Sequence, residues 1–196
     1  MISREQTQAL FDFTTPSSDD FRLWLSERIR FESFFRLFLH PDSKVIGDAV
    51  ITLYNILVAG SNRTPQNSIH PHFEQIRVIQ GIERLFQLFY ANKSQFTRDR
   101  ACLCIALLYR SQRIPNEPLE FNNSKTHKYI DKDAWKVLEG IQMQQSIICH
   151  LKSLIKDRND IWLHNEVVRA LVELGQNKSN REEILRDGFR FSQNKL

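Results

Sequence analysis

The residue types most able to bind a metal ion occur in two small groups, and neither group has the spacing of a metal site. His70 and His72 flank a proline, so they belong to an extended loop without the i, i+4 separation or the cysteine partners of zinc sites. Cys149 and His150 are adjacent and diverge on a helix, which keeps them from sharing an ion with His164. The sequence therefore predicts ordinary polar loop residues in the first group and no metal site in either.

Catalytic chemistry has no more support than metal binding. The chain contains no glycine-rich phosphate loop, no nucleophile elbow and no HExxH motif. Glu182 and Glu183 lie in the first turn of an expected helix, where the helix dipole favours carboxylates without any catalytic role. Cys102, Cys104 and Cys149 form an odd set without redox spacing, so we expect reduced core cysteines. We expect no enzymatic activity and no cofactor.

Charge and hydropathy limit the kinds of partner. The chain of 196 residues has 27 Lys and Arg against 23 Asp and Glu, a net charge of +4, without a basic tail, an arginine stripe or an acidic tract. Nucleic acid as a partner is therefore only weakly supported. The N-terminal residues lack a signal-peptide pattern, and no window approaches the roughly 18 apolar residues that span a bilayer. We expect a cytoplasmic or nuclear protein that does not bind membranes.

The apolar residues are spaced for helices along the whole chain. Six glycines and six prolines are few for an all-β protein, which needs many tight turns. Three amphipathic stretches each run into a glycine, at residues 73–81, 133–140 and 180–188. Each repeat also contains a longer helix, a polar break and another long helix. In two of the repeats, this second long helix ends near Gly60 and near Gly175. This recurrence predicts an all-α fold built from helical repeats.

Local signals near the C-terminus predict where helices end and begin. Gly175 suits the left-handed position after a helix. Ser179 and Glu182 have the spacing of a capping box, which predicts a new helix at that point. Large aromatic side chains on such helices are usually buried, so the three tryptophans are expected in the core: Trp24, Trp135 and Trp162.

Three segments resemble armadillo repeats. These are FFRLFLHPDSKVIGDAVITLYNIL, GIERLFQLFYANKSQFTRDRACLCIALL and IICHLKSLIKDRNDIWLHNEVVRALVELGQNKSNREEILRDG. In each, a helix that ends near a short polar turn leads into a third helix with small and apolar residues at fixed spacing. The resemblance implies a right-handed α-solenoid of about three armadillo-like repeats plus a partial C-terminal repeat, with the related HEAT arrangement as the open alternative.

The expected domain organisation follows from the register of these repeats. The equivalent third-helix residues Ala49, Ala101 and Val167 are separated by more than the roughly 40–47 residues of this repeat class. The excess falls in two stretches rich in Pro, Asn, Ser and Thr, which favour turns and are expected to be disordered or functional loops. A single armadillo-like domain over 1–196 then comprises an N-terminal extension at 1–17, repeat 1 at 18–60, an insertion at 61–71, repeat 2 at 72–113, a second insertion at 114–130, repeat 3 at 131–176, and a partial repeat or cap at 177–196.

The resemblance also implies where a partner would bind. In armadillo proteins the third helices line a concave groove, and a tryptophan and an asparagine at matched positions hold an extended peptide. Only Asn55 matches this pattern here, and the missing tryptophans argue against recognition of import signals. The partner-binding residues predicted from these positions are Ile51, Asn55, Leu103, Leu107, Arg169 and Glu173, together with Arg110 further along the middle third helix.

The function that the sequence favours is a non-enzymatic protein–protein interaction scaffold or adaptor, which binds a peptide or a helix on the concave third-helix surface. Two alternatives stay open. The first is a nucleic-acid-binding helical repeat, suggested by the arginines around one helix, Arg98, Arg100, Arg110 and Arg113. The second is a structural segment of a larger solenoid, whose end would expose Phe189 and Phe191. The oligomeric state is left open.

Overall fold

The computed structural model describes residues 3–116, 142–156 and 160–190. Within these ranges every regular element is a helix and no strand is present, which confirms the predicted all-α fold class. The expected helix at 133–140 and most of the second insertion lie outside the described residues. The helices are α1 (Arg4–Thr14), α2 (Asp19–Ser26), α3 (Phe31–Leu37), α4 (Ser43–Asn62), α5 (Phe73–Val78), α6 (Gly81–Ala91), α7 (Gln95–Leu108), α9 (Met143–Leu154), α10 (Ile161–Leu174), α11 (Lys178–Leu185) and the 3₁₀ turn η2 (Arg186–Gly188).

Short polar side chains determine where several helices begin. In α2, α4, α7 and α10, the residue before the helix accepts a hydrogen bond from a backbone N–H of the first turn, which satisfies one of the free donors there. These caps are Ser18, Asp42, Ser94 and Asp160. The caps of α7 and α10 fix which side chains occupy the first turns of two neighbouring helices.

Two local predictions near the C-terminus were wrong. Helix α11 begins after Asn177, whose side chain accepts hydrogen bonds from the backbone N–H groups of Ser179 and Asn180. The carboxamide of Asn177 therefore caps the helix in place of the expected Ser179 hydroxyl. Gly175 has φ −66° and ψ −7°, so it continues the right-handed helical conformation and does not adopt the left-handed one.

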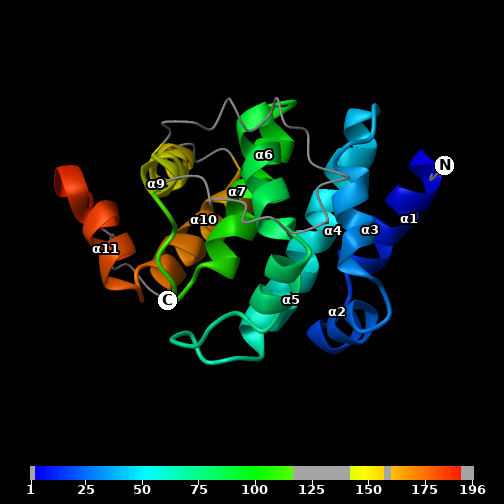
Figure 1. Ribbon diagram of the computed structural model, residues 1–196, viewed down its shortest axis with the longest axis horizontal. Helices are drawn as coiled ribbons and strands as arrows, with labels where there is room; N and C mark the ends of the chain where they lie inside the picture. Colours follow the sequence, from blue (N-terminus) through cyan, green and yellow to red (C-terminus); the bar gives the residue numbers. More distant parts are fainter. Residues whose placement is uncertain (1–2, 117–141, 157–159, 191–196) are drawn as a thin grey trace.

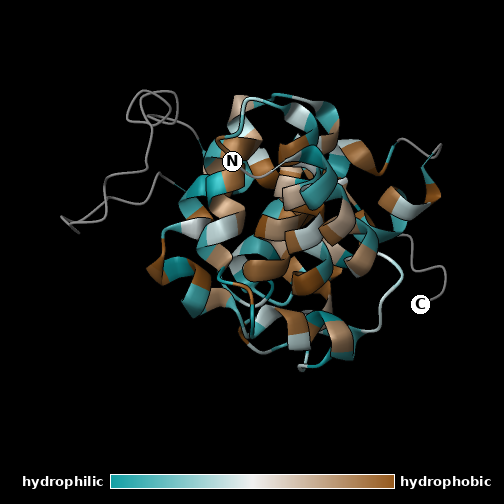
Figure 2. Ribbon diagram, turned by 90° about the vertical axis from the view of Figure 1, so that its right-hand side faces the viewer, coloured by the Kyte–Doolittle hydropathy of each residue, from teal (hydrophilic) through white to brown (hydrophobic). Residues whose placement is uncertain are grey.

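Helices α4, α7 and α10 lie side by side at the centre of the molecule (Figure 1). Each is the longer member of a packed pair, with α3 against α4, α6 against α7 and α9 against α10. Helix α7 contacts α4, α6, α9 and α10, and the side chains of residues 101–108 are at most 1% exposed. The central helices carry most of the hydrophobic residues, and the outer helical faces are mainly hydrophilic (Figure 2).

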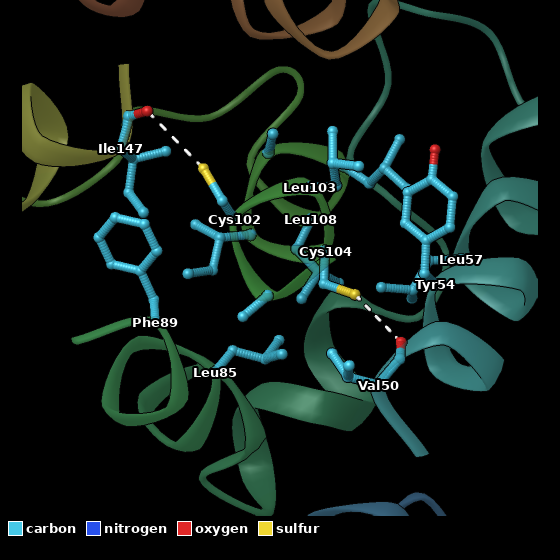
Figure 3. Packing of buried hydrophobic residues seen from close by; sticks show 14 of the residues in the cluster. Val50, Tyr54, Leu57, Leu85, Phe89, Cys102, Leu103, Cys104, Leu108 and Ile147 are labelled. Atoms are coloured by element: carbon cyan, nitrogen blue, oxygen red, sulfur yellow. Dashed lines mark hydrogen bonds between the residues drawn. The ribbon is translucent and has the colours of Figure 1, made fainter. Parts of the chain in front are cut away.

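The cysteines of α7 show how tightly this centre is packed. Cys102 donates through its Sγ to the carbonyl of Ile147 in α9 at 3.7 Å, and Cys104 donates to the carbonyl of Val50 in α4 at 3.9 Å (Figure 3). Complete burial raises the pKa of both thiols. The expected free core cysteines are therefore confirmed at these two positions, whereas Cys149 is exposed and the expectation is wrong there.

The segment expected as an N-terminal extension forms helix α1 and packs along α4. The Thr7 hydroxyl donates to Asp48 Oδ2 at 2.9 Å, and Asn55 Nδ2 donates to the Thr14 hydroxyl at 3.3 Å. The two contacts lie about two turns apart on each helix, so α1 runs parallel to α4. One face of α4 is thus covered by α1, and α2 packs against α4 as well.

The segment after α4, expected as an insertion, folds back over the end of the central helices. His70 is 1% exposed, with its Nε2 2.9 Å from the carbonyl oxygen of Leu57. Burial lowers the pKa of His70 from 6.5 to about 3, so its imidazole is neutral. A Cβ at Gly60 would lie 3.1 Å from both His70 Cε1 and Pro71 Cγ, so the glycine allows this close return. The expectation of an ordinary polar loop residue is therefore wrong for His70.

Gly81, which ends the first recurrent stretch, is required for packing. A Cβ at this position would lie 2.3 Å from Phe35 Cε2 and 2.7 Å from Ile76 Cγ2, distances that no side chain tolerates. The left-handed conformation falls on the residue before it, Gln80, with φ 58°. The glycine therefore marks the first residue of α6 at a close approach to α3.

Among the described helices, α4 is long and apolar enough to cross a membrane by length and composition, with a mean hydropathy of 1.3 over the best window. The expectation that no window approaches this length is wrong for α4. Within the fold 83% of that window is buried, as is usual for the core helix of a folded domain.

Candidate functional site

The two predicted binding residues of α4 are covered from within the chain. Ile51 is 6% exposed and Asn55 is 9% exposed. The side-chain amide of Asn55, which the armadillo resemblance assigns to a bound peptide, donates to Thr14 of α1. In this conformation α1 therefore occupies the face of α4 that was expected to receive a partner.

The two predicted binding residues of α7 belong to the hydrophobic core. Leu103 is 0% exposed and Leu107 is 1% exposed. Figure 3 shows Leu103 among side chains from the neighbouring helices. No partner reaches these side chains in this conformation, so their burial gives no support to the predicted role in binding.

Arg110, just beyond the end of α7, anchors the segment that follows α4. The residue is 0% exposed. Its Nε donates to the Ser68 carbonyl at 2.8 Å, and its Nη1 donates to the Ser61 carbonyl at 3.2 Å. Its Nη2 donates to the hydroxyls of Thr64 and Ser68 at 2.6 and 2.8 Å. The guanidinium is therefore fully engaged with the segment that covers it.

Arg169 and Glu173 join α10 to α4. Arg169 Nε donates to Glu173 Oε1 at 3.0 Å, and the Ser61 hydroxyl donates to Glu173 Oε2 at 3.4 Å. Arg169 also donates to the side-chain oxygen of Asn62. Burial disfavours the charge of Arg169, but the hydrogen bond to Glu173 and the nearby carboxylates of Glu173 and Glu166 together outweigh it and raise the pKa of the guanidinium. These two predicted binding residues therefore stabilise the contact between neighbouring long helices.

The four arginines behind the nucleic-acid alternative do not form one surface. Arg113 is exposed, whereas Arg110 is buried under the segment after α4. Arg98 is half-buried, and its guanidinium carbon lies 4.9 Å from the centre of the Phe89 ring. Arg100 is 7% exposed. A surface for a phosphate backbone needs several accessible cations together, and this cluster does not provide it.

A different group of side chains reaches the surface, at the N-terminal ends of α7 and α10. Phe96 is 45% exposed and Trp162 is 42% exposed. The guanidinium carbon of Arg100 lies between them, 4.6 Å from the centre of the Phe96 ring and 4.3 Å from that of Trp162. Phe96 and Arg100 share one face of α7 because they are four residues apart, and Trp162 is in the first turn of the adjacent α10. We call these three residues the Arg100 site.

Arg100 makes ring contacts without any hydrogen bond. Its Nε is fully buried and unpartnered, and no hydrogen bond or ion pair joins the guanidinium to any other described residue. Burial lowers the pKa of Arg100, while the nearby carboxylates of Asp99 and Asp160 oppose this effect. Both carboxylates are engaged elsewhere, since Asp99 contacts His150 and Asp160 caps α10. The guanidinium carbon thus lies over both rings, and its buried Nε has no hydrogen-bond partner among the described residues.

A polar hollow of about 380 Å³ adjoins the Arg100 site where α1, α4 and α7 meet. Phe96 is part of its lining, and the ring lies 3.5 Å from the Cβ position of Gly47 in α4. Arg4 and Lys44 also line the hollow, opposite in charge to Asp48. Burial raises the pKa of Asp48. The surface around Phe96 therefore continues from α10 across α7 onto α4 and α1.

A second exposed aromatic group lies on α2. Phe21 and Trp24 are 37% and 47% exposed, with ring centres 5.6 Å apart, and the guanidinium carbon of Arg28 lies 4.0 Å from the Trp24 ring. The expected core position of the tryptophans is therefore wrong for Trp24 and Trp162, because both side chains are partly exposed at the surface. Trp135 lies outside the described residues.

The other side chains with reactive potential have structural partners. His150 Nε2 lies 2.8 Å from Asp99 Oδ1, a buried contact that joins α9 to α7. Phe189 is partly buried beneath Lys152, whose Nζ lies 5.3 Å from the ring centre. Across the three described ranges, no three His, Cys, Asp or Glu side chains are close enough to hold a metal ion together.

The Arg100 site was not predicted from the sequence. Arg100 was expected only as part of the basic cluster, Trp162 only as a core residue, and Phe96 in no role. The spacing of Phe96 and Arg100 is visible in the sequence. Their meeting with Trp162 depends on the contact between α7 and α10, which local patterns do not reveal.

Comparisons of the chain with protein-family models, with curated proteins and with solved structures gave no match. The resemblance to armadillo repeats therefore depends on the sequence segments alone, and the Arg100 site must be interpreted from its own chemistry.

Proposed function

We propose that this chain is a non-enzymatic interaction scaffold, an armadillo-like right-handed α-solenoid that binds a protein segment across the N-terminal ends of α4, α7 and α10. The observation that carries the proposal is the Arg100 site, in which two exposed aromatic rings enclose a buried arginine. Aromatic residues and arginine are enriched at the centres of protein interfaces and among the residues that dominate binding energy. A row of long helices supplies the extended surface that such a segment needs.

The third helices still form the binding surface, but the site lies at their N-terminal ends and not at the positions first expected. The residues first expected to bind serve the interior of the molecule: Ile51, Asn55, Leu103, Leu107, Arg110 and Glu173 are at most 9% exposed. The N-terminal ends of the same helices carry the accessible aromatic surface. A partner that lies across the helices would contact α10 at Trp162, α7 at Phe96 and the hollow beside α4.

The test is affinity capture from cell extract with three forms of the chain. The double variant Phe96→Ala with Trp162→Ala removes both rings of the site, and Phe21→Ala with Trp24→Ala is the matched control because these rings on α2 are similarly exposed. We expect a set of proteins that is retained by the wild type and by the control and is lost with the first variant. Equal capture by all three forms, with circular dichroism showing intact helices, would refute the proposed site. Loss with the control alone would move the site to α2.

A further inference from the structure

We infer that Arg100 is the anchor for a carboxylate, so that the segment bound at the Arg100 site is acidic, with an apolar residue next to its Asp or Glu. This inference rests on the proposed function, because it names the chemistry of the segment that the same surface binds.

The first reason is the state of the guanidinium itself. Arg100 is 7% exposed and has no hydrogen-bond acceptor among the described residues, and its Nε is fully buried without a partner. A buried charge without hydrogen bonds is unfavourable, and the fold retains one here. A carboxylate supplies two acceptor oxygens in the planar arrangement that a guanidinium matches. A carboxylate that reaches the terminal Nη groups would therefore satisfy donors for which the described residues offer no acceptor.

The second reason is the surroundings of Arg100. The exposed rings of Phe96 and Trp162 present apolar surface on both sides of the guanidinium, which favours an apolar residue beside the carboxylate. Arg4 and Lys44 line the adjoining hollow and add two positive charges against the one carboxylate of Asp48. The charge around this end of the site therefore favours an acidic ligand.

The groups on the other side limit how acidic the segment is. Asp160 is close enough to influence Arg100, and Glu166 of α10 accepts the hydroxyl of Tyr54 beside the Trp162 ring. These carboxylates would repel a dense run of Asp and Glu. The surroundings therefore favour one carboxylate held at Arg100 within a partly apolar segment.

A protein segment fits this surface better than a nucleic acid does. Of the neighbouring basic residues, Arg110 is buried and donates to the segment after α4, and Arg98 is half-buried, so few accessible cations lie together for a phosphate backbone. One buried arginine between two rings provides a single anion contact, whereas tight backbone binding accumulates many.

The experiment begins with a phage-displayed library of random 12-residue peptides selected on the wild-type chain. We expect enriched peptides with Asp or Glu next to an apolar residue. A synthetic peptide of this kind, measured by fluorescence polarisation, should bind Arg100→Gln roughly 10- to 100-fold more weakly than wild type, as expected for loss of a charged hydrogen-bonded pair. Arg113→Gln, at an exposed arginine of the same chain segment, should leave the Kd unchanged.

Replacing the peptide Asp by Asn gives a second measurement that does not depend on a variant of the protein. This change should weaken binding to wild type by a similar factor and should have little further effect on Arg100→Gln, because the two groups act as one pair. Arg100→Lys keeps the charge without the planar fork and should bind with intermediate affinity. Circular dichroism and thermal unfolding test whether each variant is folded. If Arg100→Gln is unfolded, the effect of the Asp-to-Asn change in the peptide on binding to the wild type tests the carboxylate anchor.

Each other outcome overturns a defined part of the inference. Enriched peptides without acidic residues, whose binding needs Phe96 and Trp162 but not Arg100, would refute the carboxylate anchor and leave the proposed function intact. Failure to enrich any peptide that depends on Phe96 and Trp162 would refute both. Salt-sensitive binding of a mixed-sequence oligonucleotide that is lost in Arg100→Gln would assign the site to nucleic acid.

Discussion

Replacing Arg110 by methionine should release the segment between α4 and α5 while α7 stays folded. The guanidinium donates four hydrogen bonds: three go to Thr64 and Ser68 of this segment, and one goes to the carbonyl of Ser61 in the last turn of α4. Methionine fills a similar volume along α7 and supplies no donor. The substitution therefore isolates the polar contacts from the packing.

The expected loss of stability follows from the kinds of acceptor that Arg110 serves. The two carbonyls each lose a charged donor, and such bonds contribute about 1.5–3 kcal/mol each. The hydroxyls of Thr64 and Ser68 are half-buried and can turn towards water, so their loss costs less. Removal of a buried charge returns part of the total. We expect the free energy of unfolding to fall by about 2–4 kcal/mol.

Urea unfolding measures this change, and amide hydrogen exchange identifies where it occurs. Exchange should accelerate in residues 61–71 and stay slow in the core of α7. Arg113→Met is the matched control, because Arg113 is exposed near the same helix end, and it should change neither quantity. If Arg110→Met unfolded at the wild-type urea concentration with unchanged exchange in the segment, Arg110 would not be its anchor. The residue would then be available for the partner-binding role first expected of it.

Three further predictions test the packing. Gly81→Ala places a Cβ 2.3 Å from the Phe35 ring, so urea unfolding should show a loss of about 1–3 kcal/mol, and an unchanged midpoint would contradict the close approach. The pKa of His70 falls from 6.5 to about 3 on folding. Below pH 6.5 the imidazole is therefore protonated in the unfolded chain but stays neutral in the native one. As the pH is lowered through this window, the free energy of unfolding of the wild type should fall by about 1.4 kcal/mol per pH unit. The His70→Gln variant should lack this pH dependence when urea unfolding is measured at several pH values. Leu103→Asp combined with Leu107→Asp puts two carboxylates in the core and should abolish the helical circular dichroism signal; a folded double variant that had lost its partners would restore the groove first predicted.

Local patterns in the sequence were sufficient to predict most of the described helices, with α1 as the exception. The helix predicted to end near Gly60 ends at Asn62, and the one predicted up to Gly175 ends at Leu174. Apolar periodicity and polar breaks act within one or two turns, so they are visible without tertiary structure. The capping groups of α7 and α10 are of this local kind.

The orientation of the helices could not be predicted in the same way. Residues 101–108 of α7 are apolar on every side, so periodicity does not show which face meets solvent. Only the resemblance to armadillo repeats assigned Leu103 and Leu107 to a groove, and in the structure four helices surround them. Helix α1 posed the opposite difficulty, because it is mostly polar and its position depends on contacts with Asp48 and Asn55 far away in the chain.

The difference between the two arginine–aromatic groups at the surface explains why the Arg100 site is favoured as the binding site. Arg28, just after the end of α2, has a side chain that is 52% exposed, donates to the Trp24 carbonyl at 3.0 Å and lies 3.6 Å from Glu27. Water and these neighbours satisfy its donors, so the free protein already provides what this group needs. Arg100 is 7% exposed, and within the described part of the chain its guanidinium contacts the two rings and has no ion-pair or hydrogen-bond partner. An apolar residue in place of a buried charge without hydrogen bonds would stabilise the free protein, so stability does not explain the arginine at this position. A ligand that accepts its hydrogen bonds does explain it.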